Sequence, residues 1–163
     1  RVSSSAASDV YKRQAFLILQ GLETLSLRME KHISNTRDIV SFLNEHKEVK
    51  SVSYPELENH PDNKLAQEIL PRGCGAVFTF EIEGGLESGK KFIESLNIFS
   101  HLANVGDAKS LVIHPASTTH HRMDTLALKN AGISESTVRL SIGIEDINDL
   151  KEDLDEALKQ ANR

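Results

Sequence analysis

Apolar and polar positions alternate most regularly between residues 138 and 145, in the segment TVRLSIGIEDINDL. The apolar positions are Val138, Leu140, Ile142 and Ile144, and the positions between them are Arg139, Ser141, Gly143 and Glu145. A period of two predicts a β-strand with one apolar face. The second row is unusual for a strand, because it contains a charged residue that needs a partner and a glycine that weakens strands.

Residues 76–83 alternate in the same way, and shorter strands are predicted over residues 49–54, 98–105 and 110–114. Helical spacing of three and four predicts a long helix over residues 22–46, with a bend at Gly21. Its apolar stripe consists of Leu22, Leu25, Met29, Ile33, Thr36, Val40 and Leu43.

Four further helices are predicted. They begin near residue 62, cover residues 86–96 and 123–130, and follow Asp146 to the end of the chain. Asp146 suits the N-cap of the last helix, whose apolar stripe is Leu150, Leu154, Leu158 and Ala161. This order of elements predicts an α/β (α+β) fold, with a small mixed or antiparallel sheet covered by helices on at least one face.

One domain is predicted, over residues 15–163. Residues 1–14, RVSSSAASDVYKRQ, are rich in small polar residues and lack helical or strand periodicity. They resemble translated sequencing-adapter or vector sequence, and a flexible native linker is the alternative. Because the chain begins with Arg1 rather than methionine, we interpret it as a fragment of a longer protein.

The composition excludes several classes of partner. With 39% hydrophobic and 26% charged residues, the chain has a globular composition, and its 19 basic residues are scattered in a molecule of net charge -5. Nucleic acids and anionic membranes are therefore poor partners. No apolar run approaches the length of a membrane span. The single cysteine fits a reducing compartment, which predicts a cytoplasmic location.

Arg139 is the first candidate for a functional residue. A guanidinium on a half-buried strand requires an anion, and arginine suits a carboxylate held by two parallel hydrogen bonds. An internal salt bridge with one of the 24 acidic residues is the structural alternative, and the residues by themselves favour it. Gly143 shifts the balance slightly toward a ligand site, because a strand glycine often marks the close approach of a ligand or backbone.

The histidines, the cysteine and Lys109 have sequence surroundings that argue against a chemical role. His114, His120 and His121 lie in a loop without the acidic or thiol partners of known metal sites, so we interpret them as surface or loop histidines. Cys74 lies between two glycines and fits a backbone role rather than a nucleophile. Lys109 has no neighbour that would lower its pKa, which argues against a Schiff-base lysine.

Three segments together resemble the C-terminal part of the Cys/Met-metabolism family of pyridoxal-phosphate enzymes. They are LETLSLRMEKH (22–32), HLANVGDAKSLVIHPASTTH (101–120) and VRLSIGIEDINDLKEDLDEAL (138–158). The resemblance covers the chain from Ala15 onward and implies the small C-terminal domain of fold-type I transferases. The segment containing Asn104 and Lys109 is most similar to the O-acetylhomoserine (or O-acetylserine) sulfhydrylase branch, because most other branches have serine and glutamate at these positions.

The resemblance implies roles for two residues. Arg139 would bind the α-carboxylate of an amino-acid substrate, and Asn104 would help to orient the same group. The complete enzyme would replace the acetate of O-acetylhomoserine by sulfide or a thiol, in methionine and cysteine biosynthesis. It would be a homo-oligomer, a tetramer by family resemblance. Cystathionine gamma-synthase, a gamma-lyase and a stand-alone amino-acid-binding or regulatory domain are the alternatives, and a purely structural dimerisation domain is a further one.

The cofactor implied by the resemblance is pyridoxal 5'-phosphate, bound mainly by a large N-terminal domain. The lysine that forms the Schiff base, the ring-stacking aromatic residue and the phosphate-binding residues of the family have no counterparts in this chain. We therefore predict no catalytic, cofactor-binding or metal-binding residue here, and an inactive fragment. The segment HHRMDTLALKNAGISEST departs from the family pattern and leaves the rim of the substrate entrance undefined.

Overall fold

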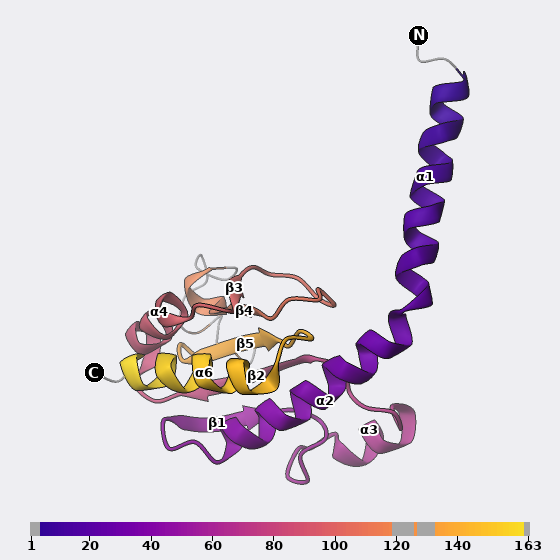
Figure 1. The fold of residues 1–163 in the computed structure, drawn as a ribbon. Helices are drawn as coiled ribbons and strands as arrows, with labels where there is room; N and C mark the ends of the chain where they lie inside the picture. The colour runs from indigo at the N-terminus through magenta and orange to yellow at the C-terminus, as the bar shows by residue number, and fades with distance from the viewer. Residues whose placement is uncertain (1–3, 119–125, 127–132, 162–163) are drawn as a thin grey trace.

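In the computed structural model, the described residues form five α-helices and a five-stranded mixed sheet (Figure 1). The structure describes residues 4–118, 126 and 133–161, with side chains from residue 10 onward. The helix predicted over residues 123–130 lies outside these residues except for Leu126.

The sheet has the strand order β1-β2-β5-β4-β3. Its strands are β1 (Val49–Ser53), β2 (Val77–Ile82), β3 (Ser100–His101), β4 (Leu111–Ile113) and β5 (Thr137–Ser141). The pairs β1–β2, β2–β5 and β4–β5 are antiparallel, whereas β3 and β4 are parallel. The predicted fold class, a small mixed sheet with helices, is therefore confirmed.

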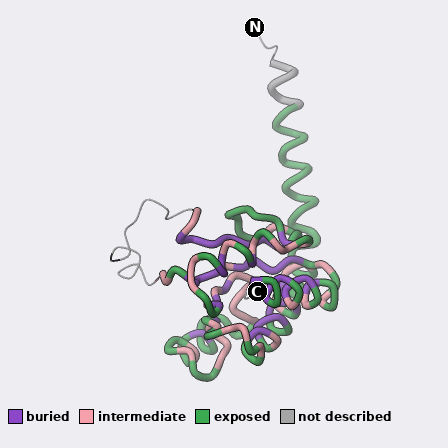
Figure 2. Tube along the Cα trace, turned by 90° about the vertical axis from the view of Figure 1, so that its left-hand side faces the viewer, coloured by how far each residue is buried: buried purple, intermediate pink, exposed green. Residues whose placement is uncertain are grey.

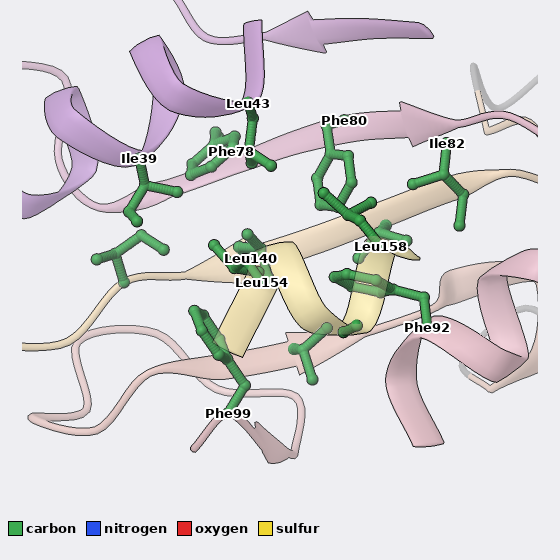
Figure 3. Packing of buried hydrophobic residues seen from close by; sticks show 14 of the residues in the cluster. Ile39, Leu43, Phe78, Phe80, Ile82, Phe92, Phe99, Leu140, Leu154 and Leu158 are labelled. Carbon is green, nitrogen blue, oxygen red and sulfur yellow. The ribbon is translucent and has the colours of Figure 1, made fainter. Parts of the chain in front are cut away.

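Helices cover one face of the sheet. They are α2 (Leu25–Asn44), α4 (Gly85–Ser95) and α6 (Ile147–Ala161). Figure 3 shows how Ile39, Leu43, Phe92, Leu154 and Leu158 from these helices pack on the strands. The strand residues in this cluster are the alternate positions Phe78, Phe80, Ile82, Val112, Val138 and Leu140, all buried. The apolar row predicted for β5 thus faces the core at Val138 and Leu140.

The polar row of β5 lies on the opposite face of the sheet. Arg139 is paired with Thr79 on β2 and Ile113 on β4, and Ser141 is paired with Val77 and Leu111. Directly opposed residues share a face, so Arg139 and Ser141 stand in one row bordered by apolar β4 side chains. Alternation stops after Ser141, where the strand ends, and Ile144 is 37% exposed rather than buried as predicted.

The predicted strands over residues 98–105 and 110–114 are shorter in the structure, where β3 and β4 pair in parallel. Two parallel strands cannot be joined by a tight turn, so the residues between β3 and β4 must lead the chain back to the end of the sheet at which β3 began. Residues 102–110 form this return, which we call the 102–110 connection. A 3-10 turn, Pro115–Ser117, follows β4.

The long N-terminal helix begins earlier than predicted and breaks later. Helix α1 (Ser4–Glu23) includes most of the segment expected to be irregular, and the break falls at Thr24 rather than Gly21. Arg28 donates from its guanidinium to the Gly21 carbonyl oxygen at 2.6 Å, which satisfies an end of α1. The origin of residues 1–14 stays a prediction.

Helix α1 projects from the body of the molecule (Figure 1), and Figure 2 shows its residues from Val10 onward as exposed. Short helix α3 (Asn63–Ile69) begins after Asp62, as predicted. Helix α6 likewise follows Asp146, whose Oδ1 accepts a hydrogen bond from the Asn148 amide at 2.8 Å. This bond is the N-cap interaction expected from the sequence. Within the described part of the chain, no helix has the length and apolar character needed to span a membrane.

Candidate functional site

Arg139 lies at the centre of the candidate site, half-buried on β5. Its guanidinium Nη2 donates to the Asn104 carbonyl oxygen at 3.5 Å, the outer limit of a hydrogen bond. Among the described residues, no acidic side chain forms an ion pair with it. The internal salt bridge considered from the sequence therefore has no partner in this part of the chain, and most of the donors of Arg139 remain available.

A narrow crevice joins Arg139 to the 102–110 connection. Its walls are formed by Leu102, Asn104, Leu111, Val112, Ile113 and Ser141, together with Arg139 itself. The structure thus brings together the two predicted site residues, although they are 35 positions apart. The Asn104 side chain is exposed, and its Oδ1 accepts from the Val105 amide at 2.8 Å. It is the backbone of Asn104 that faces Arg139.

Backbone contacts with the end of β5 hold the 102–110 connection in place. The Ile144 amide donates to the Ala108 carbonyl oxygen at 3.0 Å. The Gly143 amide donates to Ser110 Oγ at 2.8 Å. Any side chain at position 143 would collide with this connection, since an added Cβ would stand 2.6 Å from the Lys109 carbonyl carbon. Gly143 therefore permits the close approach of another backbone segment, one of the two reasons expected for a strand glycine.

Glu145 fastens the same connection with its carboxylate. One oxygen accepts from the Ser110 amide at 2.7 Å, and the other accepts from Ser110 Oγ at 2.9 Å. Hydrogen bonds to a charged acceptor are stronger than neutral ones. The last position of the polar row is thus a structural anchor, which leaves Arg139 and Ser141 as the members that face the crevice.

Two polar residues of α2 support this arrangement from the other side. Asn35 Nδ2 donates to the carbonyl oxygens of Gly143 at 3.1 Å and Glu145 at 2.9 Å. His32 Nδ1 donates to the Ile142 carbonyl oxygen at 2.6 Å. Both side chains are buried, and the sequence reasoning missed them. The sequence did contain a sign of their burial: they lie at helical spacing from Ile39 and Leu43, on the same side of the helix.

His114 lies in the connection between β4 and the 3-10 turn, as the loop interpretation expected, but it is buried, which corrects the interpretation of a surface histidine. Nε2 donates to the Glu135 carbonyl oxygen at 2.8 Å, so Nδ1 of the neutral ring accepts from Ser117 Oγ at 2.9 Å. Burial lowers the pKa of His114 and favours this neutral form. His120 and His121 lie outside the described residues. In the part of the chain that the structure describes, no three residues of metal-binding type gather into a site.

Cys74 has the backbone role that the sequence indicated. Its amide donates to Glu56 Oε1 at 2.8 Å, and the flanking glycines Gly73 and Gly75 both have positive φ. Burial, reinforced by the Glu56 charge, raises the pKa of the thiol, which disfavours the reactive thiolate. Glu56 also accepts from Arg37 Nε at 2.6 Å. The cluster fastens the loop before β2 and does not reach the crevice.

The described residues do not fit the lysine-bound end of a pyridoxal phosphate site. No lysine lines the crevice of Arg139, and the Lys109 side chain is exposed. What the crevice does offer is a cation beside hydroxyl and carbonyl groups and apolar walls. The free volume of the crevice is about 0 Å³, so a small carboxylate can bind to this set only by displacing the Asn104 carbonyl oxygen. The set cannot by itself perform the chemistry of the cofactor.

Comparison with known proteins defines the class. The family model of the Cys/Met metabolism PLP-dependent enzymes matches residues 4–159. The chain belongs to this family, whose cofactor is pyridoxal phosphate.

Within this family, the chain is similar to enzymes of two named activities. The chain is 48% identical over 145 residues to O-acetyl-L-homoserine sulfhydrylase 1 of Thermus thermophilus, which covers 89% of this chain and 34% of that protein. It is 40% identical to L-methionine gamma-lyase of Fusobacterium nucleatum, covering 91% and 37%. A solved structure from Campylobacter jejuni, assigned as an O-acetylhomoserine (thiol)-lyase with N'-pyridoxyl-lysine-5'-monophosphate, superposes with a TM-score of 0.83 at 40% identity, over 90% of this chain and 35% of that one. The chain therefore spans about a third of the length of these relatives.

Proposed function

We propose that this chain is the C-terminal, substrate-binding part of an O-acetylhomoserine sulfhydrylase. The complete enzyme replaces the acetoxy group at the γ carbon of O-acetyl-L-homoserine by sulfide or a thiol, so that a C–S bond forms and acetate leaves. Pyridoxal phosphate supplies the electron sink for this chemistry when it is bound, and the rest of the enzyme supplies most of its binding site. The part of this chain is to hold the substrate.

The observation that carries the proposal is the position of Arg139. Its guanidinium lies in a crevice with apolar walls, without an acidic partner among the described residues and with one long contact to a carbonyl oxygen. An arginine placed in this way binds a planar carboxylate through two parallel hydrogen bonds. Every α-amino acid presents such a group, so Arg139 orients the substrate and does not select among amino acids.

The choice of reaction rests on similarity. Sulfhydrylases from Thermus thermophilus and Leptospira meyeri are 48% and 49% identical to this chain, whereas the gamma-lyase from Fusobacterium nucleatum is 40% identical. A homocysteine synthase of Schizosaccharomyces pombe is 47% identical. These values favour γ-replacement, with a gamma-lyase as the second candidate.

An activity assay on the complete enzyme tests the proposal. Purified enzyme with pyridoxal phosphate, O-acetyl-L-homoserine and sulfide is expected to release homocysteine and acetate in equal amounts. The same enzyme given L-methionine without a thiol should release little methanethiol. Faster release of methanethiol than of homocysteine would instead establish a gamma-lyase.

A stand-alone amino-acid-binding domain is the alternative from another class. Calorimetry on the isolated chain with O-acetyl-L-homoserine separates the two, because a true binding module would bind alone. We expect no measurable heat, since the carboxylate site is only one part of the substrate pocket.

The enzyme is also proposed to be a homo-oligomer in the cytoplasm, in keeping with the exposed apolar surface of α1 and the single cysteine.

A further inference from the structure

Ser141 carries a hydroxyl that the fold leaves without a hydrogen-bond partner. The residue is 4% exposed, and its Oγ has no partner among the described residues. Buried polar groups are nearly always hydrogen-bonded, because an unpaired one loses its water and gains nothing in return. Within the described ranges only one other buried side-chain atom, His32 Nε2, shares this condition. A group of this kind requires an explanation.

Other hydroxyls near Ser141 do find partners, which makes the exception specific. Thr137 lies in the same row of β5, and its Oγ1 is 2.8 Å from Ser134 Oγ and accepts from the Ser134 amide at 3.0 Å. The hydroxyl of Ser110, the residue directly before β4, donates to the Glu145 carboxylate and accepts from the Gly143 amide. The unpaired hydroxyl is the one that lines the crevice of Arg139.

We propose that Ser141 Oγ donates a hydrogen bond to the carboxylate that Arg139 binds, as a second substrate-binding residue of this chain. The inference rests on the proposed function and names a contact within the same site. Arg139 and Ser141 are two positions apart on one face of a strand, about 6.6 Å along it, within reach of one ligand for a long arginine side chain.

The hydrogen-bond capacity of a carboxylate supports this assignment. An ionised carboxylate accepts about four hydrogen bonds, and a bidentate arginine uses about two of them. The remaining lone pairs need donors, and Ser141 supplies one. The carboxylate takes the place of the Asn104 carbonyl oxygen, whose one hydrogen bond within the described residues is the 3.5 Å contact with Arg139. The apolar walls from Leu111 and Ile113 strengthen both interactions by excluding water.

The test compares Ser141→Ala with the matched control Thr137→Val in the complete enzyme. Calorimetry measures the Kd of L-norleucine, an unreactive amino acid, and of pentylamine, which is the same molecule without its carboxylate. Thermal unfolding is measured on each variant without these ligands. Activity with O-acetyl-L-homoserine is recorded on the wild type.

For Ser141→Ala we expect the Kd of norleucine to rise roughly tenfold or more, since the lost bond has a charged acceptor. The Kd of pentylamine should not change, and the melting temperature should not fall, because the removed hydroxyl has no partner in the free protein. Thr137→Val should behave in the opposite way, with a lower melting temperature and an unchanged Kd. This contrast separates ligand binding from a purely structural role.

Three results would overturn the inference: an unchanged Kd for norleucine in Ser141→Ala, an equal loss for pentylamine, or a lowered melting temperature. A wild type that binds no norleucine would overturn it as well. Failure of the proposed reaction can be told apart from failure of the Ser141 contact. An enzyme that binds norleucine through Ser141 but forms no homocysteine contradicts the reaction alone, whereas an active enzyme indifferent to Ser141→Ala contradicts only the new contact.

Discussion

Gly143 and Ala108 are in direct backbone contact, because a Cβ added to Gly143 would stand 2.5 Å from the Ala108 carbonyl oxygen. The next amide, that of Ile144, donates to the same oxygen at 3.0 Å. The segment after β5 and the 102–110 connection therefore meet at Gly143, with the Glu145 carboxylate and the Ser110 hydroxyl beside the contact. This contact helps to place Asn104 against Arg139 and explains why a residue that weakens strands follows the end of β5.

Substitution of Gly143 should disturb both the fold and the site. Gly143→Ala forces the connection away, and overpacking of this kind costs roughly 1–3 kcal/mol. Urea unfolding of the chain should show that loss. Gly21→Ala is the matched control, since an added Cβ there meets nothing within 4 Å and alanine favours a helix by about 0.5–1 kcal/mol. Equal stability of Gly143→Ala and the wild type would contradict the close contact.

Arg139→Ala in the complete enzyme should abolish most of the activity without affecting the fold. Loss of one partner of a buried, hydrogen-bonded charge pair costs roughly 3–5 kcal/mol, so kcat/KM should fall by about two to three orders of magnitude or more. Arg139→Lys should recover only part, because an ammonium lacks the planar fork. Cofactor absorbance should remain normal in both. A lowered melting temperature with nearly normal kcat/KM would assign Arg139 to the scaffold.

The isolated chain should be inactive and should not form a specific complex with pyridoxal phosphate. The Arg139 crevice contains no lysine among its lining residues, and a Schiff base needs an unprotonated one beside a phosphate site. Spectroscopic titration should give weak absorbance that dialysis removes. A saturable one-to-one complex that survives dialysis would contradict this prediction, and Lys109→Ala would then show whether that lysine is responsible.

The isolated chain should self-associate through α1. Phe16, Leu17, Ile18 and Leu19 are each more than half exposed, and a contiguous exposed apolar patch usually marks a surface that another protein covers. Light scattering and binding of an apolar dye should report the association. Phe16→Ser combined with Leu19→Ser should reduce both signals. Leu65→Ser, at an exposed site on a different helix, α3, should leave them unchanged. A monomeric wild type that binds no dye would refute the prediction.

His114 should make the stability of the chain depend on pH. Its pKa is lowered in the folded protein, chiefly by burial and also by the charges of Lys90 and His101. The unfolded state therefore takes up a proton first, and stability should decline as the pH falls below the ordinary histidine value of about 6.5.

Unfolding experiments between pH 7.5 and pH 5 check this effect. His114→Gln should flatten the slope of unfolding free energy against pH, even if its stability is lower throughout. His60→Gln is the control at a partly exposed position, where the ring bonds to Ser53 Oγ and the Asp62 amide among the described residues, and it should keep the wild-type slope. An unchanged slope in His114→Gln would contradict the assignment.

Local patterns in the sequence were sufficient for most elements. The alternation in residues 76–83 and 138–141 gave the strands and the face they bury, because the side chains of a strand point alternately to its two sides. The stripe of α6 and the cap at Asp146 were likewise readable from spacing. The unusual charge on β5 was sufficient to single out Arg139, although its role in binding a carboxylate remains a proposal.

Only the tertiary structure decided how distant segments meet. Parallel pairing of β3 with β4 sends the 102–110 connection across the open face, and the contacts of Gly143, Glu145 and Asn35 fix it beside Arg139. The burial of His32 and the unpaired hydroxyl of Ser141 belong to the same assembly. Periodicity reports which side of an element is buried, but the partner of a buried polar atom is set by packing between residues up to 110 positions apart, and no local pattern encodes that choice.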